Sequence, residues 1–105
     1  MEDRNIAINI IGLSRTEREN MEYMAVYKDK NTNKTLNPKK LRDHLITWTI
    51  EEVINSDVVY SKVVYEDNAS LGFIVEHHHI HDEIVNRSGR IRLIASLTKI
   101  KKEEQ

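Results

Sequence analysis

The chain has 105 residues, a formal net charge of −1 and no cysteine, and 31% of its residues are charged. This length suits one domain, and the near-neutral balance excludes an overall field that would attract nucleic acid or an anionic membrane. The missing cysteines exclude disulfides, thiol catalysis and cysteine-based metal sites, and they are consistent with an intracellular, cytoplasmic protein.

No stretch approaches the roughly 18 apolar residues of a membrane span, and the charged N-terminus does not have the character of a signal peptide. We also find no internal repeat. We therefore expect a single domain over residues 1–105, with a lysine- and asparagine-rich loop at 29–37 and a frayed tail at 101–105.

The start of the chain predicts a strand followed by a second element of ambiguous type. Residues 4–13 alternate between apolar and polar side chains, which is typical of a strand with one face in the core. Ser14 and Glu17 have the spacing of a helix capping box, which favours a helix over about 15–28. The segment 23–27 could equally be a short strand, and the chain would then begin with a hairpin-like pair.

The clearest helix signal of the sequence begins at Asn37. Asparagine is a good N-cap, and Pro38 suits the first helical position, where its missing N–H is not needed. The residues that follow are apolar at so many positions that a helix over 38–55 would be buried on two sides. Trp48 would be a core anchor within this helix, and His44 an ordinary surface histidine.

The C-terminal half predicts strands. Residues 57–66 are rich in valine and tyrosine, 67–70 have the composition of a turn, and 72–83 would be a strand that carries four of the five histidines. We expect these two strands to form an antiparallel hairpin. From Arg90 the alternation resumes, with inward positions at Ile91, Leu93, Ala95 and Leu97.

These elements together predict an α+β fold. It would contain a small, mostly antiparallel sheet of about four strands, with one long helix (about 38–55) and possibly a second (about 15–28) packed on one face. The edges of the sheet and the two apolar sides of the helix over 38–55 would remain partly exposed in so short a chain. We therefore expect a second copy to cover them, in a homodimer or a higher oligomer. A symmetry axis would also bring the histidine strands of several subunits together.

The histidine strand is the candidate metal site. His77, His79 and His81 would share one face at steps of roughly 6.5–7 Å. Two neighbouring imidazoles could then bind one divalent transition metal (Zn, Ni, Fe or Mn), with Glu83 or a residue of another strand or subunit completing the shell. The alternatives are solvated histidines without a ligand role and a patch that responds to pH near 6.5.

The spacing Gly72-x4-His77-x-His79-x3-Glu83-x5-Gly89 resembles the first metal motif of the cupin superfamily, small β-barrel proteins whose His, His and Glu bind a metal. The resemblance implies His77, His79 and Glu83 as metal ligands. It covers this stretch alone, because the second motif of the family needs a later histidine and none follows His81.

A second candidate surface is basic. Between Glu83 and Glu103 there is no acidic residue, and arginine and lysine side chains could contact phosphates there. The expected exposed face has no aromatic side chain on which bases could stack, which favours an acidic protein partner or a solvated face over nucleic acid. The basic residues are Arg87, Arg90, Arg92, Lys99, Lys101 and Lys102.

The sequence contains no Gly-rich phosphate loop, His-Glu-x-x-His, Gly-x-Ser-x-Gly or Asp-x-Asp calcium loop. We therefore expect a small non-enzymatic binding or regulatory protein that acts through its surface on a protein partner. Its lysine-, asparagine- and isoleucine-rich composition is compatible with an accessory protein of a phage or mobile element. The alternatives are a metal-binding protein or metal-dependent enzyme that uses the His77–His81 strand, and a nucleic-acid-binding protein that uses the basic strand at 87–102.

Overall fold

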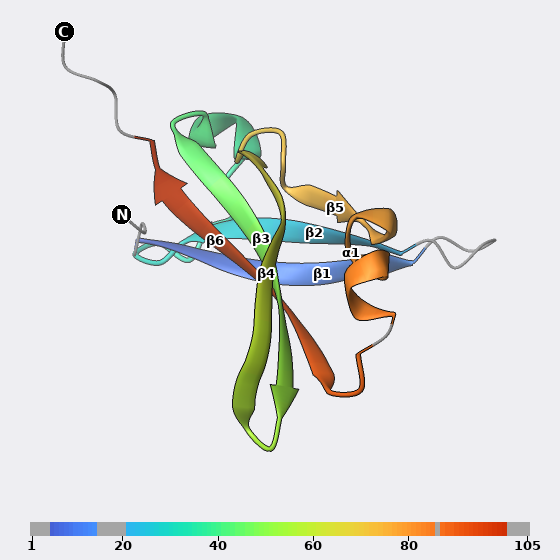
Figure 1. Cartoon of the computed structure of the whole chain (residues 1–105). Coiled ribbons are helices and arrows are strands. Elements are labelled where there is room, and N and C mark those ends of the chain that lie inside the picture. The colour runs from blue at the N-terminus through green and yellow to red at the C-terminus, as the bar shows by residue number, and fades with distance from the viewer. Residues whose placement is uncertain (1–4, 15–20, 86, 101–105) are drawn as a thin grey trace, which may run out of the picture.

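The structure is a computed structural model, and it describes residues 5–14, 21–85 and 87–100. These residues form two three-stranded antiparallel sheets and one short α-helix (Figure 1). The predicted α+β class, with a long helix packed on one sheet of about four strands, is therefore wrong, because the chain is built mostly of strands.

The first sheet contains the two N-terminal strands and a short third one. β1 (Ile6–Ser14) pairs antiparallel with β2 (Met21–Asp29), and β2 also pairs antiparallel with β5 (Ile74–Glu76). The alternative in which the chain begins with a hairpin-like pair of strands is confirmed. The helix predicted over 15–28 is wrong from Met21 onward, and residues 15–20 lie outside the described part of the chain.

The helix prediction failed in β2 because its burial has a period of two. Ala25 and Tyr27 are almost fully buried, whereas Val26 between them is only half-buried. This alternation is the pattern of a strand with one face in the core. Of the predicted capping box, Ser14 is the last residue of β1, and Glu17 lies outside the described residues.

The second sheet has β3 (His44–Ile54) at its centre. β4 (Asp57–Asn68) pairs antiparallel with one side of β3, and β6 (Arg90–Lys99) pairs antiparallel with the other side. The strands predicted at 57–66 and from Arg90 are confirmed. The predicted hairpin between 57–66 and the histidine stretch is wrong, because β4 and β5 belong to different sheets.

The helix predicted over 38–55 is wrong. The Asn37 side chain does accept a hydrogen bond from the Lys39 backbone N at 3.0 Å, but the result is a single 3₁₀ turn, Pro38–Leu41. From His44 onward the chain contains many β-branched side chains, which are stiff in a helix and pack well in a sheet. The buried residues of β3 recur at every second position: His44, Ile46, Trp48, Ile50 and Glu52.

The two sheets pack face to face with their strands crossing steeply, and one apolar core lies between them (Figure 1). Trp48 was predicted as a core anchor and is fully buried, and its indole Nε1 donates to the Gly72 carbonyl oxygen at 2.8 Å. Gly72 leaves no room for a side chain, because a Cβ there would lie 2.7 Å from the Cβ of Asp67. The buried members of the core are Ala25, Tyr27, Leu41, Ile46, Trp48, Ala69, Val75 and Leu97.

The helix α1 (His77–Ile84) follows β5 directly and packs beside β2 and β4. Among the described residues, no helix combines the length and the apolar character that crossing a bilayer requires. His44, which the sequence predicted at the surface, is buried as the first residue of β3 and lies 2.9 Å from the Asp43 carboxylate.

We expect Tyr27→Phe to destabilise the fold by about 1 kcal/mol at neutral pH. The Tyr27 hydroxyl donates to the buried carbonyl oxygen of Ala69 at 3.0 Å, and the variant leaves that acceptor without its donor. Denaturant unfolding, followed by the fluorescence of the single tryptophan Trp48, measures the loss. Leu71→Ala changes a residue that is 72% exposed and should cost less than about 0.5 kcal/mol.

The same variant should alter the alkaline limit of stability. Burial raises the pKa of Tyr27 far above its ordinary value of 10.0, so the folded protein keeps this proton while the unfolded chain loses it. The free energy of unfolding should therefore fall as the pH rises above about 10, and Tyr27→Phe should remove part of that fall. Identical slopes above pH 10 in both proteins would contradict this account.

Candidate functional site

The histidine-rich stretch forms a helix, and the strand predicted over 72–83 is wrong from His77 onward, since only Ile74–Glu76 of that range is a strand. β5 ends at Glu76, which has the extended backbone of a helix N-cap, and α1 begins at the next residue. Ile80 is 4% exposed and anchors α1 in the protein interior. The sequence does contain this signal, because the next apolar residue after Ile80 is Ile84, and a separation of four is the repeat of a helix face.

The helix brings His77 and His81 together, one turn apart. The Nε2 atom of His77 lies 3.1 Å from the Nδ1 atom of His81, and the ring centroids are 5.1 Å apart. His79 instead contacts the Tyr65 ring, at 4.7 Å between centroids, and the ring of His78 lies 4.2 Å from that of His79. The strand face on which His77, His79 and His81 were predicted to lie together therefore does not exist.

Glu83, the predicted carboxylate ligand, takes part in a different contact. Its carboxylate accepts hydrogen bonds from Lys62 Nζ at 2.7 Å and from the Tyr60 hydroxyl at 3.2 Å. The hydrogen bond from Lys62 holds the pKa of Glu83 below its usual value. Among the described residues, no group of three or more His, Cys, Asp or Glu side chains is arranged to hold a metal ion, so the ligand set implied by the cupin resemblance is not assembled.

Arg87 extends the contact between the helix and the second sheet. Its guanidinium carbon lies 3.5 Å from the centroid of the Tyr60 ring, and its Nη1 lies 3.5 Å from the Glu52 carboxylate. Glu52 is buried and also accepts a hydrogen bond from the Gly89 backbone N at 2.9 Å. A Cβ on Gly89 would lie 2.7 Å from the Glu52 Cγ, so this close approach requires glycine. These contacts attach the segment after α1 to β3.

The four described residues of the predicted basic surface do not form one patch. Arg90 and Arg92 project from β6 to the outer face of the second sheet, where Arg92 donates to Glu51 at 2.6 Å. Arg87 lies on the inner face with Glu52 and Tyr60, and Lys99 ends β6 at its opposite end. Two of the predicted residues lie outside the described part of the chain: Lys101 and Lys102.

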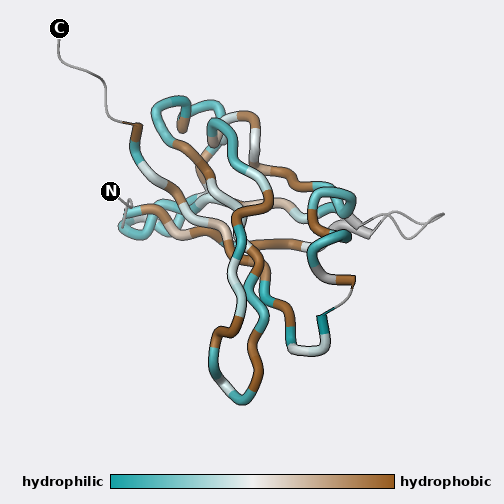
Figure 2. The backbone as a smooth tube through the Cα atoms, viewed as in Figure 1, coloured by the Kyte–Doolittle hydropathy of each residue, from teal (hydrophilic) through white to brown (hydrophobic). Residues whose placement is uncertain are grey.

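A surface that the sequence did not predict is the hairpin of β3 and β4. It projects beyond the rest of the molecule and carries apolar segments on both arms near its tip (Figures 1 and 2). Its turn residues Asn55 and Ser56 both have positive φ, 53° and 70°, as in type I′ hairpin turns. We call the following exposed apolar residues the hairpin surface: Ile54, Val58, Val59 and Val63.

β4 is an edge strand of the second sheet, and its pairing with β3 is irregular. The register shifts between Trp48 and Thr49 and again between Glu52 and Val53. At each shift β4 contains one residue more than β3, and at the second shift this residue is Val59. The residue is 54% exposed, so the bulge presents an apolar side chain to the surroundings beside an edge that has no neighbouring strand in the described structure.

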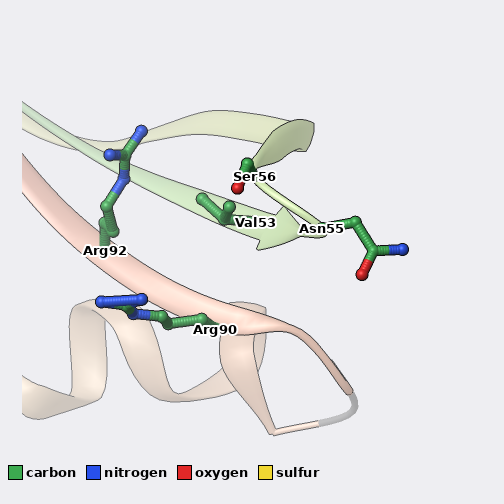
Figure 3. Close-up of a pocket in the computed structure, with 5 residues that line it drawn as sticks. All are labelled: Val53, Asn55, Ser56, Arg90 and Arg92. Carbon is green, nitrogen blue, oxygen red and sulfur yellow. The ribbon is translucent and has the colours of Figure 1, made fainter.

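A cavity of about 440 Å³ lies beside the hairpin tip, open on one side. Figure 3 shows Arg90 and Arg92 on β6 and Val53 on β3 between the two arginines and the turn. Because Arg92 is already paired with Glu51, the guanidinium that can receive a carboxylate attached to an apolar group is that of Arg90, beside Val53. The lining residues are Val53, Asn55, Ser56, Arg90 and Arg92.

The sequence contains a signal for this hairpin, although the helix predicted over 38–55 ends at the same residues. Asn55 and Ser56 are flanked by the apolar pairs 53–54 and 58–59, and a two-residue turn between such pairs is typical of a hairpin. The strong helix start at Asn37 extended the predicted helix through this region.

Comparisons of the chain with protein-family models, with curated proteins and with solved structures found no match. The proposals below therefore depend on the chain's own residues.

We expect Lys62→Met to loosen α1, because it removes the ion pair that ties Glu83 to β4. Hydrogen-exchange protection should fall over residues 77–84 and stay unchanged in β2. Since the pKa of Glu83 is lowered from 4.5, the ion pair contributes above that pH and is lost as the pH falls through the lowered value. Wild-type protection in α1 should therefore approach that of the variant at acidic pH. Lys39→Met, in the exposed 3₁₀ turn, is the matched control and should change nothing in α1.

Proposed function

We propose that the chain is a small, non-enzymatic protein-binding module whose contact surface is the β3–β4 hairpin. The observation that carries this proposal is the group of exposed apolar side chains on the projecting hairpin. Single exposed apolar residues are ordinary, but apolar residues gathered on one element mark a contact surface. Four such residues lie on this hairpin: Ile54, Val58, Val59 and Val63, each between 40% and 54% exposed.

The free edge of β4 supports an extended segment as the bound partner. An edge strand presents unpaired backbone N–H and C=O groups, and a partner strand can add to it by main-chain hydrogen bonds. β4 is 12 residues long, at least twice a typical strand of about 5–6 residues, and an exposed strand edge is a template for pairing with another chain. A bound segment would cover the exposed valines with its own apolar side chains.

The charged side chains beside the hairpin indicate which residues a partner segment would contain. On the outer face of the second sheet, Val53 of β3 lies between Val58 of β4 and Arg90 of β6. Two apolar side chains and one cationic side chain are therefore neighbours on this face. Glu51 already engages Arg92 in an ion pair, so a carboxylate of the partner would be received by Arg90. We therefore propose a partner segment that combines apolar side chains with aspartate or glutamate.

A cytoplasmic location, which a chain without cysteine fits, is part of this proposal. The predicted homo-oligomer can no longer be argued from a two-sided helix over 38–55, since this segment is mainly β3. The β4 edge is the remaining argument for self-association, and a second copy is the competing occupant of the hairpin surface.

The test uses a photo-crosslinking amino acid at position 58 and, as a control, at position 71. Leu71 is 72% exposed and apolar but lies away from the hairpin, in the turn after β4. We expect crosslinks to one partner from position 58 and none from position 71. The double variant Val58→Ser/Val59→Ser should then bind the purified partner about tenfold more weakly or worse, whereas Leu71→Ser should bind it normally.

The fluorescence of Trp48 verifies that each variant is folded. Equal crosslinking from positions 58 and 71, or unchanged affinity of the double variant, would overturn the proposal. If the crosslinked species is a dimer of this chain, and its native mass returns to that of a monomer in the double variant, the occupant is a second copy and the proposed acidic partner is wrong.

A further inference from the structure

The His77/His81 pair is the arrangement on the molecule with the clearest unassigned chemistry. The two rings lie one helical turn apart on α1, and their nearest nitrogen atoms are 3.1 Å apart. Histidines separated by four residues on a helix place both imidazoles on one face, where they can bind the same metal ion. His81 is exposed, so this side of the pair is open to solvent.

The separation of the two nitrogen atoms matches a chelate. An imidazole nitrogen binds Zn²⁺ at about 2.0–2.1 Å, so two cis ligands on one ion lie roughly 2.8–3.4 Å apart. The observed 3.1 Å falls within that interval. The Nδ1 atom of His77 is buried, so Nε2 is the nitrogen of this ring that an ion can reach.

The same distance also suits a hydrogen bond between the two rings, in which one nitrogen donates and the other accepts. The hydrogen bond and the chelate are mutually exclusive, because a metal needs the lone pairs of both nitrogens. The two assignments differ in whether an ion binds, which makes them separable by titration.

The remaining histidines of α1 do not join the pair. His79 lies against Tyr65, and the Nδ1 atom of His78 lies 3.6 Å from the Glu76 carboxylate. The described residues bring no third His, Cys, Asp or Glu to the pair. A bound ion would therefore keep open positions for water or for a donor from another molecule.

We propose that His77 and His81 form a two-imidazole chelate for a borderline divalent transition-metal ion, of which Zn²⁺, Ni²⁺ and Cu²⁺ are the candidates. Imidazole suits these ions, whereas Ca²⁺ and Mg²⁺ prefer oxygen ligands. The chelate would link the first and second turns of α1. This site is independent of the hairpin surface, and the failure of either proposal leaves the other untouched.

The test is calorimetric titration of the tag-free chain with ZnCl₂, beside His81→Ala and His78→Ala. His78 is the matched control, because it is an exposed histidine on the same helix outside the pair. We expect the wild type to bind Zn²⁺, His81→Ala to bind it about tenfold more weakly or worse, and His78→Ala to keep its affinity within about twofold. Far-UV circular dichroism and Trp48 fluorescence verify the folds.

A second measurement identifies the ligands. The electron paramagnetic resonance spectrum of the Cu²⁺ complex should show two nitrogen ligands in the wild type and one fewer in His81→Ala. A ratio of one ion per two chains, lost in His81→Ala, would also support the pair, since a second copy would then fill the open positions. Absence of Zn²⁺ binding, or equal weakening in His78→Ala and His81→Ala, would overturn the proposal.

Discussion

The burial of Trp48 between the two sheets is the contact on which the rest of the structure depends. The indole occupies the middle of the central strand β3, is fully buried, and donates to the Gly72 carbonyl oxygen, which belongs to the segment leading into β5. The Trp48 side chain thus links the second sheet to the segment that leads into β5, the third strand of the first sheet. Removing a buried side chain of this size costs about 3–5 kcal/mol, a large fraction of the roughly 5–15 kcal/mol of a typical domain.

The steep crossing of the two sheets explains why β3 has residues both in the core and at the surface. β3 has 11 residues and β4 has 12, and the first sheet crosses them near their middle (Figure 1). Ile46, Trp48 and Ile50 are buried on the inner face, whereas Ile54 lies beyond the crossing and Val58 lies on the outer face opposite Val53, and both stay exposed. The same apolar, β-branched composition therefore forms the core on the inner face of the hairpin and the proposed contact surface at its tip and on its outer face.

The helix α1 shows how secondary structure decides which histidines can act together. In a strand, His77 and His81 would be about 13 Å apart, at roughly 3.3 Å per residue, and in the helix their nearest nitrogen atoms are 3.1 Å apart. The helix stays in place because Ile80 is buried and because Glu83 is bound by Lys62 of β4. The segment that follows is attached to β3 through Glu52, which accepts from Gly89.

Patterns of period two determined much of this protein by themselves. Alternation predicted the strands at the N-terminus and from Arg90, the valine- and tyrosine-rich composition predicted the strand at 57–66, and the prediction that Trp48 lies in the core is confirmed. Only the tertiary structure decided the segments with conflicting local signals. The cap at Asn37 is satisfied by one 3₁₀ turn, and β3 is then a strand because β4 and β6 pair with both of its edges. The position of α1 likewise depends on residues that are distant in the sequence, because the helix contacts β2 and β4 and its eight residues are too few for a stable isolated helix.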